Sequence, residues 1–141
     1  NDVWAVASDT SGNLAHWNGS AWSVQTIAAG VRFMAIAGTS GSNLWFGASQ
    51  SSGYIAFQYW NGAQLSNVGS STYAPTAALW ASPTGDVWAS AGSLKLMHIA
   101  GQQSALPYTL PMQTFINAIA GSASNDVWAV GTGGLVLHAT P

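Results

Sequence analysis

The hexapeptide "NDVWAV" occurs twice in this chain of 141 residues, at Asn1–Val6 and at Asn125–Val130. Two weaker copies lie between them, "SNLWFGA" at Ser42–Ala48 and "GDVWAS" at Gly85–Ser90. The central tryptophans follow one another at intervals of 41, 43 and 40 residues: Trp4, Trp45, Trp88 and Trp128. An interval this regular indicates an internal structural repeat.

Other segments keep the same interval. An Ala-rich apolar run precedes three of the four copies, at Phe33–Gly38, Thr76–Ala81 and Ile116–Gly121. A turn and a second apolar run follow each copy, at Gly12–Gly19, Tyr54–Gly62, Ser93–Gly101 and Gly133–Thr140. A more variable run comes after three of these. Four short runs separated by Gly, Ser, Asn or Pro are the pattern of strands and turns, and four strands in about 42 residues are typical of one β-propeller blade.

The sequence therefore predicts an all-β fold, a β-propeller of four-stranded antiparallel blades. We expect a single domain over residues 1–141, with repeat units at 1–30, 31–72, 73–113 and 114–141. The runs predict fourteen strands, about three and a half blades, because the first unit lacks its first strand and the last unit lacks its fourth.

An incomplete ring leaves apolar blade faces and strand edges uncovered. We expect further copies of the chain to complete the ring, with a dimer favoured, whose two sets of strands would equal seven four-stranded blades. Two alternatives are a fragment of a longer propeller and a monomeric small ring with incomplete blades. The chain has neither an initiator methionine nor a signal peptide, so we expect a processed product or a piece of something longer.

The repeat resembles the tectonin-like and BNR-like propeller repeats of bacterial secreted proteins. The clearest copies are Ala118–His138 and Asn1–Trp22, with the pattern A-I-A-G, N-D-V-W-A-V-G and H-W-N-G-x-x-W. The second unit departs at Asn43 and Leu44, and the third at Ile99 and Ala100. The resemblance implies a propeller fold, and these families include sugar-binding, protein-binding and scaffold members. It also suggests a secreted or cell-surface location.

Charged residues are rare, at 4% of the chain against a typical ~25%. Two cations cannot neutralise a row of phosphates, so we expect no nucleic-acid partner and no polybasic membrane contact. The chain has no cysteine and therefore neither a disulfide nor a thiolate zinc site. No apolar run is long enough to predict a membrane span.

The titratable residues occupy repeated positions. The histidines share one position of the repeat and three aspartates share another: His16, His98 and His138, and Asp2, Asp86 and Asp126. Positions related by rotation about a propeller lie too far apart to bind one metal ion or to act as an acid–base pair. No phosphate-binding loop or nucleophile elbow is present. We therefore expect no metal, no cofactor and no enzymatic activity.

Four of the eight tryptophans occupy the same repeat position, and we expect these four to fill the spaces between blades: Trp4, Trp45, Trp88 and Trp128. The candidate ligand-binding residues are aromatic and amide side chains near two Asn-Gly pairs: Trp17, Asn18, Trp22, Tyr59, Trp60 and Asn61. Exposed rings beside amides suit neutral sugars. The alternative is that each Asn-Gly forms a type I′ hairpin turn and the tryptophan packs on its own blade.

The leading prediction is thus a non-catalytic, lectin-like module that binds a neutral glycan or glycoconjugate, with sites repeated around the ring. The competing prediction is a structural or protein-interaction scaffold in an extracellular assembly.

Overall fold

The computed structural model describes residues 2–51, 53–68, 78–93, 95–101, 106–110 and 113–139, and the side chains of residues 53–56 and 106 are not described. The predicted unit boundary at residues 72 and 73, together with Asn1, Thr76 and Ala77 of the predicted segments, lies outside these residues. The described residues form fourteen strands in four antiparallel sheets, which are the blades of a β-propeller.

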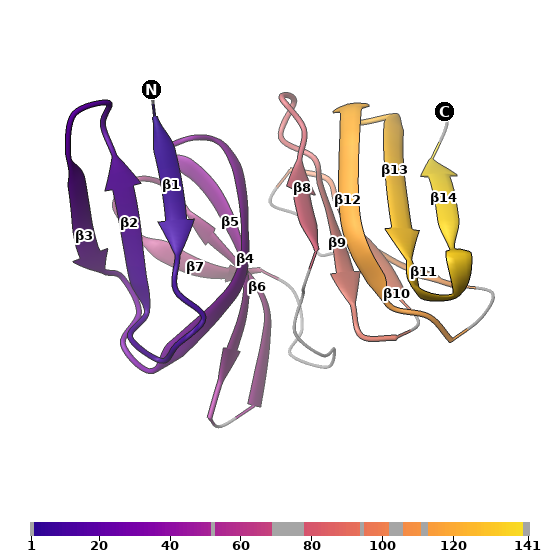
Figure 1. Ribbon diagram of the computed structural model, residues 1–141, viewed down its shortest axis with the longest axis horizontal. Coiled ribbons are helices and arrows are strands. Elements are labelled where there is room, and N and C mark those ends of the chain that lie inside the picture. The colour runs from indigo at the N-terminus through magenta and orange to yellow at the C-terminus, as the bar shows by residue number, and fades with distance from the viewer. Residues whose placement is uncertain are drawn as a thin grey trace.

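The blades follow one another along the chain (Figure 1). Blade 1 comprises β1 (Val3–Val6), β2 (Asn13–Trp17) and β3 (Trp22–Thr26). Blade 2 comprises β4 (Val31–Ser40), β5 (Asn43–Gln50), β6 (Gly53–Trp60) and β7 (Leu65–Val68). Blade 3 comprises β8 (Leu79–Ala81), β9 (Val87–Ala91), β10 (Lys95–Ile99) and β11 (Leu106–Thr109). Blade 4 comprises β12 (Ile116–Ala123), β13 (Asp126–Gly131) and β14 (Val136–Ala139), with the 3-10 helix η1 (Thr132–Gly134) before β14.

Neighbouring strands within each blade are also neighbours in sequence, so every blade is a meander. The first strands of blades 2, 3 and 4 surround a hollow of about 320 Å³, to which Met34, Leu79 and Asn117 contribute. Blade 1 has no strand in this inner position, and blade 4 ends at its third strand, within the described residues. No helix among the described residues is long and apolar enough to cross a membrane.

Each chain thus contributes four separate sheets, and its two three-stranded sheets are not halves of one blade. Two copies would therefore supply eight such sheets, whereas the strand count alone led to the expectation of seven four-stranded blades. The reason is that strands of blades 1 and 4 already pair within their own sheets and pack against blades 2 and 3.

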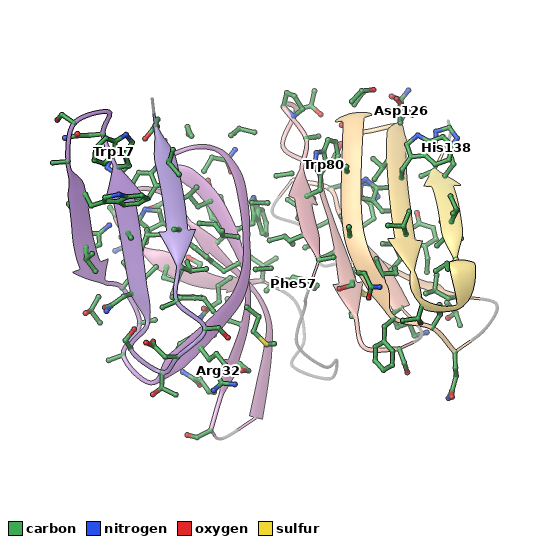
Figure 2. All side chains as sticks on the ribbon, viewed as in Figure 1. Trp17, Arg32, Phe57, Trp80, Asp126 and His138 are labelled. Carbon is green, nitrogen blue, oxygen red and sulfur yellow. The ribbon has the colours of Figure 1, made fainter. Side chains whose placement is uncertain are left out.

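Apolar side chains from facing sheets fill the three spaces between blades (Figure 2). Between blades 1 and 2, Leu14 faces Phe46, whose ring lies 4.7 Å from that of Phe33. Between blades 2 and 3, Trp45 packs with Val87. The third space holds Trp88 and side chains of β12 and β13. Because alternate residues of a strand point to opposite faces, each inner blade contributes to two of these clusters.

Replacing Phe46 by Ala tests how much the space between blades 1 and 2 stabilises the fold. Phe46 is completely buried against Phe33, so its truncation leaves a cavity, and we expect a loss of about 3–5 kcal/mol in the free energy of unfolding. Urea or thermal unfolding would measure it. Phe115→Ala is the matched control, because Phe115 is 60% exposed and its loss should change stability by no more than about 0.5 kcal/mol. Equal effects of the two substitutions would contradict the assignment of this core.

Candidate functional site

The histidines stack on the repeated tryptophans within their own blades. The centroids of the two rings are 3.9 Å apart for Trp4 and His16, and also for Trp128 and His138, with the planes within 9°. The Trp88–His98 pair is similar, at 4.3 Å and 12°. In each pair the two residues are directly opposite on adjacent strands. The stacking therefore follows from the register of the second and third strands of the repeat.

Each of these imidazoles also faces the repeated aspartate. The His Nε2 to carboxylate oxygen distance is 2.5 Å to Asp2 in blade 1 and 2.8 Å to Asp126 in blade 4. In blade 3 the corresponding distance, from His98 to Asp86, is 3.7 Å, and His98 Nε2 is buried without a hydrogen-bond partner among the described residues. Figure 2 shows Asp126 and His138 together at one end of blade 4. Among the described residues no group of three or more His, Cys, Asp or Glu side chains could hold a metal ion.

Blade 2 carries a different set at the same positions. Tyr59 replaces the histidine, and its ring is tilted by 49° to that of Trp45 at 4.9 Å. Asn43 replaces the aspartate and donates to Thr39 Oγ1 at 2.7 Å. The position thus keeps an aromatic pair and a polar turn contact without a carboxylate or an imidazole. The feature common to all four blades is therefore the aromatic pair, and not the Asp–His pair.

The pKa of Asp126 is held below its usual 3.8, first by a hydrogen bond from Ser122 and then by one from His138. A carboxyl group with a lowered pKa in the folded chain stabilises the fold above its ordinary pKa, and this contribution is lost as the pH falls through the folded value.

The four tryptophans of the repeat differ in exposure. Trp45 and Trp88 are buried at 2% and 7%, and Trp4 is half-buried against blade 2. Trp128 is 47% exposed in the single chain. The reason is positional. Trp45 and Trp88 each face a following blade, whereas the described chain places no blade after Trp128.

The predicted sugar-binding group of blade 2 does not form one site. Trp60 is 7% exposed and packs between blades 1 and 2. Tyr59 points the other way and packs against the cluster between blades 2 and 3. Adjacent residues of a strand lie on opposite faces, so these two rings cannot hold one ligand together.

The Asn-Gly pairs are turns of a different type from the type I′ alternative. Asn18 Oδ1 accepts hydrogen bonds from Ser20 N, Ser20 Oγ and Ala21 N, and Asn61 Oδ1 accepts from Ala63 N and Gln64 N. Gly19 has φ of 98° and Gly62 has φ of 96°, but no described residue other than glycine has a positive φ. A type I′ turn needs two consecutive positive φ values, so the side chain of Asn closes each hairpin instead.

The corresponding group in blade 1 remains partly accessible. Trp17 and Trp22 are opposite one another on β2 and β3, with ring centroids 5.8 Å apart. Trp22 is 55% exposed. Asn18 lies in the turn that joins these strands, so the three predicted residues of blade 1 are close together.

A groove that the sequence analysis did not identify lies between blades 3 and 4. It has a volume of about 550 Å³, and its lining includes Tyr108 and Leu110 from blade 3 and Leu137 and Ala139 from β14. Tyr108 is 48% exposed, and its ring stacks on Trp88 at 5.7 Å and 25°. The ring of Tyr108 is thus packed on Trp88 and remains about half exposed.

This groove lies where blade 4 has no fourth strand among the described residues. In blade 2 the fourth strand, β7, pairs with β6 and packs Leu65 into the space shared with blade 1. The described part of blade 4 stops at β14, so the corresponding space is open and the outer edge of β14 has no strand partner there. The sequence analysis predicted that the last unit lacks its fourth strand, and this prediction could have indicated the position of the groove.

A second groove, of about 420 Å³, lies beside the free edge of β1. It is bordered by Asp2 and Trp4 on blade 1 and by Ile36 and Leu44 on blade 2. Here the missing element is the inner strand of blade 1. Each blade with three described strands thus borders a groove where a fourth strand would lie.

Comparison with known proteins shows the fold. Neither a protein-family model nor a curated protein matches the chain. The chain is similar to the structure of YCF48 bound to D1 peptide, with a TM-score of 0.74 and 15% identity over 96% of this chain and 46% of that one. YCF48 from Cyanidioschyzon merolae gives a TM-score of 0.71 and 15% identity, over 94% of this chain and 45% of that chain. XC5397 from Xanthomonas campestris, a gluconolactonase, gives 0.63 and 16%, over 92% and 44%. The chain spans about half the length of these structures.

Asn18→Ala tests the role of the amide in the blade 1 hairpin. The substitution removes the acceptor of three hydrogen bonds in an exposed turn, and we expect a loss of about 1 kcal/mol in the free energy of unfolding. Asn18→Asp is the matched control, because it keeps an acceptor oxygen at the same place and should remain close to the wild type. Chemical denaturation of the three proteins would measure both effects. If Asn18→Asp is as unstable as Asn18→Ala, the Oδ1 acceptor is not what closes the turn.

Asp126→Asn tests the contact with Ser122 and His138. The amide cannot carry the charge that these donors stabilise, so the variant should melt at a lower temperature than the wild type at neutral pH. Because the pKa of Asp126 is lowered, the difference between the two melting temperatures should shrink as the pH falls below about 4. Thermal melts across this range would check it. A difference that stays constant with pH would exclude the charge as its cause.

Proposed function

We propose that this chain is a non-catalytic binding propeller that takes an extended, uncharged peptide segment in the groove beside β14. The observation that supports it best is the coincidence of an apolar groove with an open strand edge. Leu137 and Ala139 of β14 line the groove, and β14 is the last strand of its sheet in the described part of the chain. An extended peptide can add to such an edge through main-chain hydrogen bonds, and the adjoining groove can select its side chains.

The register of the blades indicates which side chains would enter the groove. In blade 1, Trp22 and Val24 of the fourth-position strand β3 lie opposite Trp17 and Ala15 of β2. The positions of β14 that correspond to Trp17 and Ala15 are Ala139 and Leu137. A strand added antiparallel to β14 would therefore place every second side chain against Leu137, Leu110 and Tyr108.

The lining of the groove sets the chemistry of the segment. None of the described lining residues is Asp, Glu, Lys or Arg, and the polar ones are His98, Thr109, Ser124, Asn125 and His138. A charged side chain would lose hydration there, and none of these four charged residue types lies in the described lining to compensate for that loss. Apolar or small polar side chains at alternate positions suit this groove.

The fold comparison also supports a peptide ligand, because YCF48 is a propeller of similar fold whose structure was solved with a bound D1 peptide. A non-catalytic role is supported by the small number of carboxylates. The sequence contains four, and three of them face histidines in their own blades. The resemblance to tectonin-like and BNR-like repeats of secreted proteins supports placing this activity outside the cell or at its surface.

A neutral glycan is the second candidate ligand, at the hairpin of blade 1. The observation that favours it is the exposed ring of Trp22, 55% accessible beside Trp17. A flat exposed indole near amide groups can stack on a sugar ring. The Oδ1 of Asn18 is already used in the turn, so Asn18 would contribute its NH₂ group to such a site.

A synthetic peptide with the sequence AWSVQTI, which is residues 21–27 of β3 and its flanks, is a suitable probe for the groove. The peptide is uncharged, and its apolar and polar side chains alternate as they do in β3, the outermost strand of blade 1. We expect a fluorescent form of it to bind the protein, measured by anisotropy. Tyr108→Ala should weaken binding about tenfold, because it removes an exposed aromatic side chain from the groove.

The matched controls separate the two ligands. Phe115→Ala removes an exposed aromatic ring that belongs neither to the groove nor to the hairpin of blade 1, and it should leave peptide binding unchanged. The same peptide with Asp at the positions of Trp22 and Val24 should not bind. Absence of binding by the unmodified peptide would rule out strand addition at β14. Retention of the protein on a neutral glycan array, lost in Trp22→Ala and kept in Tyr108→Ala, would favour the glycan instead.

A further inference from the structure

The two ends of the row of blades carry apolar sheet faces that no described blade covers. On blade 1, Val3 is 50% exposed, Trp22 55% and Val24 64%. These residues lie with Trp17 on the face turned away from blade 2, because Trp4 and Val6 occupy the face toward it. We call Val3, Trp17, Trp22 and Val24 the blade 1 face.

The other end has a similar surface. On blade 4, Trp128 is 47% exposed, Val130 44% and Val136 60%. Trp128 and Val130 alternate along β13 with Val127 and Ala129, which pack toward blade 3. Trp128, Val130 and Val136 therefore point away from blade 3 and form what we call the blade 4 face.

Two positions of the blade 1 face, those of Val3 and Trp17, are buried where they recur in blades 2 and 3. Val3 directly precedes the repeated tryptophan. The corresponding residues are Leu44, Val87 and Val127, with exposures of 3%, 0% and 3%. Trp17 corresponds to Trp60, which is 7% exposed between blades 1 and 2.

The blade 4 face obeys the same rule. Trp128 corresponds to Trp45 and Trp88, which are buried against the following blade. Val136 lies opposite Val130. The residues in its position in the other blades are Leu14, Phe57 and Leu96, with exposures of 0%, 1% and 8%. The side chains of this face are therefore of the kind that the chain buries three times against a next blade.

We propose that the blade 4 face of one copy packs against the blade 1 face of a second copy, in the manner of two successive blades. The second copy is the occupant that the structure supports, because it carries the surface that blades 2, 3 and 4 each present to the blade before them. The seven residues that define the two faces are uncharged, and Asp126, which lies on the same side of β13 as Trp128, already faces His138 within blade 4. The contact continues an interface that already occurs three times within the chain.

The contact is heterologous, because two different faces meet, and such contacts close into a ring when the rotation allows. The chain covers 44–46% of three propellers of similar fold, so two copies have about the length of one such ring. The proposed assembly is therefore a closed dimer of eight blades with two identical contacts. The blade 4 face and the groove residues Leu137 and Ala139 lie on opposite sides of the same sheet, and the proposal does not depend on the proposed peptide ligand.

Analytical ultracentrifugation of the full chain and of two charged variants tests the proposal. The wild type should sediment with twice the 14.5 kDa mass of the chain. Trp128→Asp changes only the blade 4 face and Val3→Asp only the blade 1 face. Each variant alone should be monomeric, because both contacts of the ring use the altered face. Both sites are exposed in the isolated chain, so circular dichroism should show an unchanged fold.

Mixing the two variants gives the discriminating result. The Val3 variant keeps its blade 4 face and the Trp128 variant keeps its blade 1 face, so one contact remains intact and a mixed dimer should form. Met34→Asp is the matched control, because Met34 is an exposed apolar residue of the central hollow and its variant should remain dimeric. A monomeric wild type would overturn the proposal. So would a mixture that stays monomeric, or a dimer that survives either single substitution, since both would exclude contact between the blade 1 and blade 4 faces.

Discussion

Every sheet of this protein has two faces rich in apolar side chains, and a sheet cannot cover either face by itself. Alternate residues of each strand point to opposite sides of the sheet. The repeated tryptophan therefore points toward the next blade, while the residues directly before and after it point toward the preceding blade. Blades 2 and 3 have neighbours on both sides, and their faces are buried in the three clusters between sheets. The stability of each blade therefore depends on the presence of the next, as in other repeat architectures.

This dependence explains which parts of the fold could be predicted from the sequence. The interval between tryptophans and the run-and-turn pattern are local properties, and they predicted the propeller fold and the incomplete first and last blades. The exposure of a side chain, by contrast, depends on blades that are distant in the sequence. Trp88 and Trp128 occupy nearly the same pentapeptide, yet one is 7% and the other 47% exposed, because a further described blade follows only the first. Trp60 is buried against the preceding blade, whereas no described blade precedes Trp17.

The candidate sites show the same division between local and distant information. The Asn-Gly pairs predicted turns, but the type of turn depends on a side-chain oxygen that replaces a backbone acceptor, as with Asn18 and Asn61. The aromatic residues of blade 2 formed a plausible group in sequence, and strand alternation sends Tyr59 and Trp60 to different clusters. The groove beside β14 has no sequence motif of its own, because residues from β10, β11 and β14 border a space where a strand is absent.

The groove and the blade 4 face are also connected through the strand that the groove would accept. A segment bound along β14 would direct half of its side chains toward Tyr108 and the other half toward the side of Trp128 and Val136. The second set would extend the blade 4 face, which is the surface proposed to meet another copy. Occupation of the groove and contact between copies would then change one another's free energy by the same amount. Ser23 and Gln25 hold the corresponding outer positions in β3, and both are small or flexible polar residues that a neighbouring blade could accommodate.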